Sequence, residues 1–79
     1  MQRKGVESSM LRSVGYDPST RVLELEFRNG RLYRYGEVGE EIYQELMAAP
    51  SKGRYFLDYI DDMYPYAPVP GTRRSKRRS

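Results

Sequence analysis

Four consecutive residues, Ser51 to Arg54, have the composition of a helix start that binds an anion. Ser is a common helix N-cap, and the first backbone N–H groups of a helix can donate to a phosphate. Lys52 and Arg54 would add two cations, and Gly53 would let a ligand approach the backbone closely. The simpler alternative is a capped helix start, with Gly53 fitted against a neighbouring element and both cations in water.

The last seven residues, RRSKRRS, are a second group of cations. Residues 73–79 carry +5, whereas residues 1–72 carry −2 from nine basic and eleven acidic side chains, so the net charge of +3 belongs to the tail. Such a tail favours contact with nucleic-acid phosphates. The alternative is a disordered end that only improves solubility. The residues that would contact phosphate are Arg73, Arg74, Lys76, Arg77 and Arg78.

Two tyrosines, Tyr33 and Tyr35, flank Arg34. Aromatic side chains on a sheet can stack on unpaired bases, and the arginine between them could contact phosphate. The alternative is that both rings pack under the helices with their hydroxyls at the rim. We favour packing, because tyrosine rings add much apolar area to a small core.

Three carboxylates, Asp58, Asp61 and Asp62, are close together in sequence and could hold Mg²⁺ or serve as acid and base. A solvated helix face is the simpler explanation, since Asp58 and Asp62 are like charges four residues apart. The chain has no His and no Cys, which removes the usual zinc ligands and nucleophile–base pairs. We therefore expect no catalytic residues, no metal site, no cofactor and no small-molecule substrate.

The length of 79 residues predicts one small domain over residues 1–70, followed by a basic disordered tail over residues 71–79. Charged residues make up 32% of the chain. No apolar run approaches the roughly 18 residues that a membrane helix needs, so we expect no membrane contact. The absence of cysteine and of an apolar leader favours a cytoplasmic protein.

A β-hairpin over Arg21–Tyr35 organises the predicted fold. Leu23, Leu25 and Phe27 alternate with glutamates, which is the period of a half-buried strand. A loop of three residues ending at Gly30 would keep apolar residues opposite apolar ones and place Gly30 in a left-handed bulge. The expected pairs are Leu25 with Tyr33, Leu23 with Tyr35, and Glu24 with Arg34.

The remaining elements complete an α+β fold: a three-stranded antiparallel meander followed by two helices packed on one face. The first strand covers Ser8–Tyr16, with a bulge near Ser13 or Gly15 that lets Leu11 and Val14 both point inward. One helix runs from Val38 to Ala48 or Ala49, and a second begins at the N-cap Ser51 and is stopped by Pro65. The residues expected to be most buried are Leu25, Phe27, Val38, Ile42, Leu46, Phe56 and Ile60.

Several short motifs, in this order and spacing, resemble the KTSC domain. They are Ser8–Asp17 (SSMLRSVGYD), Tyr33–Tyr35 followed by Val38, Ser51–Phe56 (SKGRYF), Ile60 and Tyr64–Tyr66. The resemblance covers about residues 6–67. The family is named for a segment at the C-terminus of some lysyl-tRNA synthetases, and it also occurs as small free-standing bacterial and phage proteins.

The resemblance implies a binding module that contacts RNA, such as tRNA or another structured RNA. Lys52, Arg54 and the tail would then bind phosphate. The alternative is a protein–protein adaptor that uses an open sheet edge or the proline-rich segment Tyr64–Pro70 to bind a protein partner.

Overall fold

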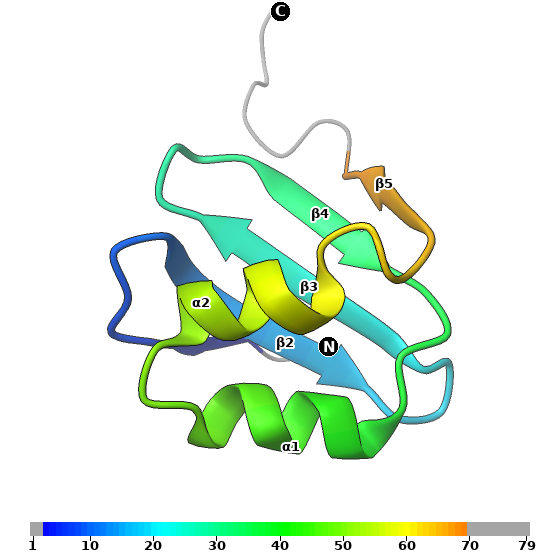
Figure 1. Ribbon diagram of the computed structural model, residues 1–79. Helices are drawn as coiled ribbons and strands as arrows, with labels where there is room; N and C mark the ends of the chain where they lie inside the picture. The colour runs from blue at the N-terminus through cyan, green and yellow to red at the C-terminus, as the bar shows by residue number, and fades with distance from the viewer. Residues whose placement is uncertain (1–2, 70–79) are drawn as a thin grey trace, which may run out of the picture.

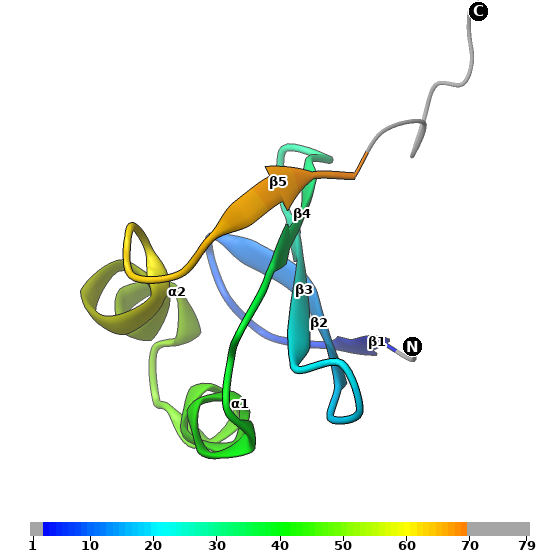
Figure 2. The same ribbon diagram turned by 90° about the vertical axis from the view of Figure 1, so that its right-hand side faces the viewer.

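The computed structural model describes residues 3–69 as an antiparallel sheet with two helical segments on one face (Figures 1 and 2). Strand order in the sheet is β1-β2-β3-β4-β5, so every strand pairs with its neighbours in the sequence. The elements are β1 Arg3–Gly5, β2 Leu11–Asp17, β3 Val22–Phe27, β4 Leu32–Tyr35, α1 Glu40–Ala48, α2 Lys52–Tyr55, the π-helical turn η1 Phe56–Ile60, and β5 Tyr66–Pro68.

The β3–β4 hairpin has the register that the alternation predicts. Leu25 pairs with Tyr33, Leu23 with Tyr35, and Glu24 with Arg34. The Phe27 N–H donates to the Arg31 carbonyl at 2.8 Å, and the Gly30 N–H donates to the Phe27 carbonyl at 2.9 Å, which leaves a loop of three residues. Gly30 has φ 92°, a left-handed value that glycine adopts without steric cost.

The predicted bulge in the first long strand lies at Arg12. Leu11 pairs with Phe27 but Ser13 pairs with Glu26, so one residue of β2 is extra. The bulge resets the alternation, and Leu11 and Val14 are both fully buried although they are three residues apart. The strand begins at Leu11 rather than Ser8, because the Ser8 hydroxyl accepts from the Met10 and Leu11 N–H groups in a turn.

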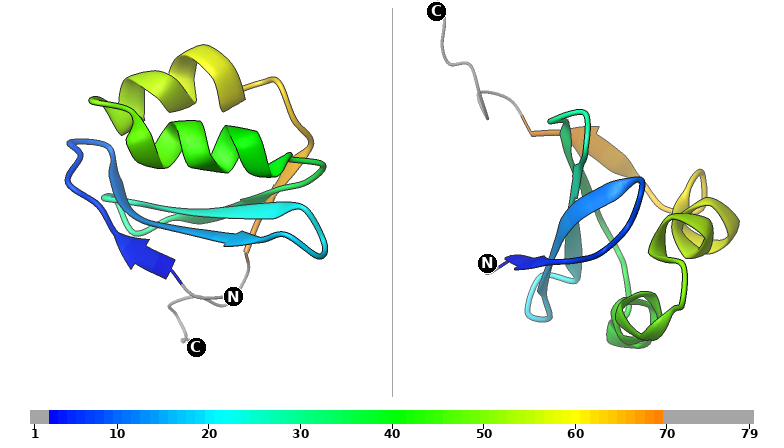
Figure 3. Two further views of the ribbon diagram at one scale, coloured as in Figure 1. Left: turned by 90° about the horizontal axis from the view of Figure 1, so that it is seen from below. Right: turned by 90° about the vertical axis from the view of Figure 1, so that its left-hand side faces the viewer.

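The prediction of three strands was wrong, because β1 and β5 extend the sheet at both edges (Figure 3). β1 pairs with β2 from Arg3 opposite Gly15 to Gly5 opposite Ser13. β5 pairs with β4 from Tyr66 opposite Tyr35 to Pro68 opposite Tyr33. Proline has no N–H to donate to a second neighbour, and Pro68 is tolerated because β5 is an edge strand.

The two helices form where they were predicted, but the first begins at Glu40 rather than Val38 and the second ends earlier than expected. α1 stops at Ala48, just before Pro50, and Ser51 caps α2 by accepting from the Arg54 N–H at 3.3 Å. The chain then forms the π-helical turn η1, in which the Asp61 N–H donates to the Phe56 carbonyl five residues earlier. Asp62 at φ 65° follows η1, so the helix ends before Pro65 and Met63 is 67% exposed.

The core fills the space between the sheet and the helices. Of the seven residues expected to be most buried, Phe27 and Ile42 are only partly buried, and the other five are buried. Phe27 is the last residue of β3, and its ring lies edge-on to Phe56 with 5.4 Å between the ring centroids. The buried apolar residues are Leu11, Val14, Leu23, Leu25, Leu32, Tyr35, Val38, Leu46, Phe56 and Ile60.

Candidate nucleic-acid interface

Both cations of the Ser51–Arg54 segment have a partner within the domain. The Lys52 ammonium donates to the Ala49 carbonyl at 3.2 Å, and the Arg54 guanidinium pairs with Asp58 at 3.2 Å. A Cβ on Gly53 would lie 3.1 Å from the Met10 Cβ, so this glycine is needed for close packing of α2 on the loop before β2. These contacts favour the capped helix start, and anion binding at its N–H groups stays a prediction.

The two tyrosines of β4 lie on the face of the sheet that carries the core, opposite Leu25 and Leu23. Tyr35 is 4% exposed, and its ring contacts Phe56 at 5.7 Å and Tyr66 at 5.4 Å between centroids. Burial also raises the pKa of the Tyr35 phenol well above its usual value. Tyr33 is partly buried and lies edge-on to Phe27 at 5.8 Å. This is the packing that the sequence favoured, and Tyr35 offers no free face for a base.

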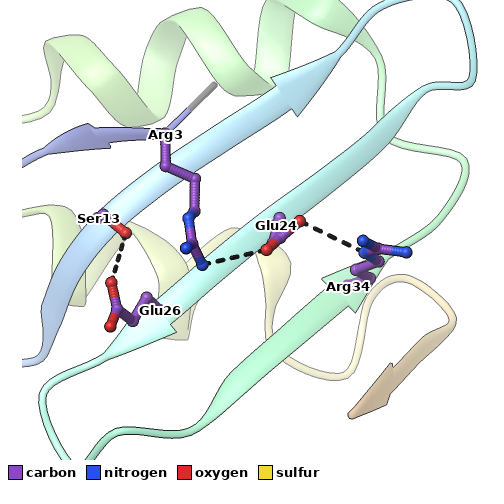
Figure 4. A network of polar contacts seen from close by, with 5 residues as sticks. All are labelled: Arg3, Ser13, Glu24, Glu26 and Arg34. Atoms are coloured by element: carbon purple, nitrogen blue, oxygen red, sulfur yellow. Dashed lines mark hydrogen bonds and ion pairs between the residues drawn. The ribbon is translucent and has the colours of Figure 1, made fainter. Parts of the chain in front are cut away.

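Arg34 points to the other face of the sheet, where it joins a polar network (Figure 4). The Glu24 carboxylate accepts from Arg3 of β1 at 3.1 Å and from Arg34 of β4 at 3.3 Å. Beside it, the Ser13 hydroxyl donates to Glu26 at 2.8 Å. Glu24 is 7% exposed, so this face is held together by a nearly buried carboxylate between two arginines. Tyr33, Arg34 and Tyr35 therefore do not share a surface.

Three arginines that sequence reasoning did not select surround Phe27 at one end of the sheet. Arg12 is the bulge residue opposite Phe27, Arg28 follows Phe27 in the loop, and Arg31 pairs with it across the hairpin. All three are exposed. Arg28 is fixed to the loop before β2, because its N–H donates to the Met10 carbonyl at 2.9 Å and its Nε donates to the Ser8 carbonyl at 2.6 Å.

The start of α2 lies at this same end, since Gly53 packs against Met10 and Ser8. Lys52 and Arg54 thus join the three arginines, and in Figures 1 and 3 the β1–β2 loop, the β3–β4 hairpin and the start of α2 lie together. We call this set the basic end; it consists of Arg12, Arg28, Arg31, Lys52 and Arg54.

Charge is divided between the two layers of the fold. Residues 3–35, which form β1 to β4, hold seven basic and four acidic side chains and carry +3. Residues 36–69, which form the helices and β5, hold two basic and seven acidic side chains and carry −5. Glu40 and Glu41 lie in the first turn of α1, and Glu37 precedes it in the chain. The start of α1 is at the opposite end of the molecule from the basic end (Figure 1).

The five members of the basic end are separated by up to 42 positions in the chain, between Arg12 and Arg54. Their proximity depends on the bulge, the hairpin register and the packing of Gly53, none of which a charge count reveals. The predicted hairpin register already places Arg28 and Arg31 in or beside one loop. It was therefore the one feature of the sequence from which part of the basic end could have been predicted. The tail cations Arg73 to Arg78 lie outside the residues that the structure describes.

Within residues 3–69, no group of three or more His, Cys, Asp or Glu side chains could hold a metal ion. Asp58 pairs with Arg54, and both side chains are open to water at 49% and 76% exposure, which fits the solvated helix face expected of Asp58. Asp61 and Asp62 lie after η1 rather than on a helix face, and Asp61 is partly buried. In the same range, no helix is long and apolar enough to cross a membrane.

The fold is that of a small α+β domain with two helical segments on one face of an antiparallel sheet, and its surface is divided into basic and acidic parts. The family model of the KTSC domain matches residues 7–64. The chain belongs to the KTSC domain family. The crystal structure of a KTSC domain protein from Yersinia pestis superposes with a TM-score of 0.85 at 41% identity, covering 86% of this chain and 96% of that one.

Relatives in sequence are of two kinds. An uncharacterized protein of Stutzerimonas stutzeri is 52% identical over 56 residues, which span 71% of this chain and 79% of that protein. A lysine–tRNA ligase of Nostoc sp. is 40% identical over 60 residues, which span 76% of this chain. The matched segment makes up 11% of that ligase, so the domain is a small part of a much longer protein there.

Proposed function

We propose that this protein is a non-enzymatic module that binds RNA through the basic end of its fold. The observation that carries the proposal is the gathering of Arg12, Arg28 and Arg31 around Phe27, with Lys52 and Arg54 beside them. An exposed cluster of cations is what a phosphate backbone requires. The cations of residues 73–78 add contacts of the non-specific kind.

Two further features support RNA as the ligand. The domain is similar to a segment of a lysine–tRNA ligase, a protein that by its name acts on tRNA. The helical half of residues 3–69 is acidic and would repel a phosphate backbone, so the charge distribution favours one orientation of the module on RNA. With no His and no Cys in the chain, a role in binding fits the side chains better than a role in catalysis.

The adaptor alternative is weaker at the sheet edges. β1 is three residues long, and Arg3 and Lys4 are exposed on it. β5 is equally short and ends in Pro68, which cannot donate to an added strand. Charged residues, prolines and shortness are the features by which proteins block pairing at an edge. A protein partner would therefore need a surface other than the backbone of these two strands.

The proposal is tested by the salt dependence of RNA affinity in the full-length chain. We expect wild type to bind a fluorescent single-stranded RNA with Kd in the roughly 10⁻⁴–10⁻⁶ M range of weak complexes. Arg12→Gln with Arg31→Gln should weaken binding and reduce the slope of log affinity against log salt by about 0.7 for each lost contact. Fluorescence anisotropy at several salt concentrations provides both quantities.

A matched control removes two cations elsewhere on the sheet. Lys4→Gln with Arg21→Gln makes the same change in net charge away from the basic end, and it should leave the slope unchanged. If both pairs of substitutions weaken RNA binding equally, binding follows total charge, and the proposal that RNA contacts the basic end is wrong. A full-length variant with all five tail cations changed to Gln separates the tail: if it binds no RNA, the fold is not the binding element.

A further inference from the structure

A groove of about 250 Å³ lies beside the second helical segment, next to the basic end. One side is the turn after α1, with Ala49, Pro50 and Ser51. The other side is the outer surface of α2 and η1, with Tyr55 and Tyr59. The RNA-binding expectation for the tyrosines of β4 does not use this groove, and the predicted anion site at the helix start shares only Ser51 and Arg54 with its lining.

Tyr55 and Tyr59 form an aromatic pair in which Tyr55 is held by a hydrogen bond and Tyr59 is exposed to solvent. Their ring centroids are 4.7 Å apart with the planes tilted by 37°. The Tyr55 hydroxyl donates to Glu45 of α1 at 2.7 Å, and burial together with this carboxylate raises the pKa of Tyr55 to about 12. Tyr59 is 56% exposed and its ring packs against the Tyr55 ring, so Tyr59 presents aromatic surface to water.

Charged groups at the rim connect the groove to the basic end. Arg54 lines the groove and is also a member of the basic end. The Arg54 side chain is 76% exposed, and its guanidinium pairs with Asp58, a second lining residue, at 3.2 Å. A chain of phosphates that follows the basic end would therefore reach Arg54, and the base attached to the next sugar would be beside the tyrosines.

We propose that this groove binds one unpaired nucleobase of a single-stranded RNA, stacked on Tyr59, while Arg54 contacts the neighbouring phosphate. The inference rests on the proposed function and specifies its ligand as single-stranded rather than duplex RNA. Stacking suits this pair because every base has a π-face and a partly exposed tyrosine needs no rearrangement to receive it. Asp58 at the rim can accept from an amino group on the base edge.

The test compares two RNAs on the full-length protein: a short single-stranded oligonucleotide and a duplex with the same number of phosphates. Tyr59→Ala should weaken single-strand binding by roughly 5- to 150-fold, which corresponds to the loss of one aromatic–base stack. Tyr59→Phe should retain the affinity, since the ring rather than the hydroxyl stacks. Duplex binding should be unchanged by both, because paired bases are not available to the groove.

Leu57→Ala is the matched control, since Leu57 is 49% exposed on the same helical turn and does not line the groove. It should leave both affinities unchanged, and thermal melting confirms that each variant is folded. If Tyr59→Ala leaves single-strand affinity intact while Arg12→Gln with Arg31→Gln lowers it, the groove assignment is wrong and the proposed function stands.

Two other outcomes also contradict the groove as a base site. Equal weakening of single-strand and duplex binding by Tyr59→Ala would show that the ring does not distinguish unpaired bases. The second outcome comes from two NMR titrations, one with RNA and one with a proline-rich peptide. If the peptide shifts the Tyr59 signals and RNA does not, the groove is a peptide-binding site. If the wild-type protein binds neither the single-stranded RNA nor the duplex, the proposed function itself fails. This result differs from the outcomes above, which contradict the groove assignment alone.

Discussion

The Glu24 carboxylate is almost out of water although it lies on the face of the sheet that the helices leave open (Figures 2 and 4). Arg3 and Arg34 cover it from opposite sides and tie β1 and β4 to β3. Hydrogen bonds to charged groups contribute about 1.5–3 kcal/mol each, and less where a partner is solvated. Because the side chains of Arg3 and Arg34 are 36% and 58% exposed, we expect the lower part of that range.

Replacement of Glu24 by Ala should therefore lower the free energy of unfolding by about 1–3 kcal/mol, since it removes both bonds and leaves two unpaired arginines. Asp58→Ala is the control: its pair with Arg54 is exposed on both sides and should contribute less than about 0.5 kcal/mol. Urea denaturation of both variants measures the difference. Equal losses would mean that Glu24 is no more important than a surface charge.

Individual residues were predicted well where local physics decided them. Gly30 was placed in a left-handed bulge because only a loop of three residues kept Leu25 opposite Tyr33. Ser51 was placed as a cap because a hydroxyl can accept from the third N–H of a helix. Tyr59 and Met63 have the spacing of an apolar helix face with Phe56 and Ile60, and yet both are exposed. The π-helical turn changes the angular position of Tyr59, and the helix ends before it reaches Met63.

Among the strands, the longer ones were predicted from the sequence and the shortest ones were not. β3 and β4 were found with the correct register because six and four residues of alternation fix a strand face. β1 and β5 have three residues each, too few to carry a period. β5 is also rich in proline, which argues against a strand unless its edge position is known. A tertiary contact stabilises β5 in this position: the Tyr66 ring stacks on the Tyr35 ring with 5.4 Å between the centroids.

The second helical segment is docked mainly by Phe56 and Ile60, which are 5% and 0% exposed. Phe56 also contacts Phe27 and Tyr35 edge-on. Phe56→Ala should cost about 3–5 kcal/mol, a large part of the stability of a small domain. Its neighbour Leu57, half in water, should cost little when changed to Ala. If thermal melting places the two variants within a few degrees of each other, the segment is not docked in this way.

The molecule as a whole separates its charges, and the candidate site arises from that separation. The sum of −2 over residues 1–72 suggested that only the tail was basic, because the opposite charges of the two layers of the fold nearly cancel in that sum. The sequence therefore could not single out the basic end; only the bulge at Arg12, the β3–β4 loop and the packing of Gly53 bring its members together. The tail cations stay a prediction, outside the described residues.

The central claim, that the basic end is where the fold meets RNA, is tested most directly by mapping the contact on the full-length chain. Two-dimensional ¹H–¹⁵N NMR spectra of labelled protein should be recorded while single-stranded RNA is added. The account predicts shifts at the amides of Arg12, residues 28–31, Lys52 and Arg54, and no shifts at residues 37–41. Shifts confined to residues 73–78, or spread evenly over both ends of the sheet, would contradict it.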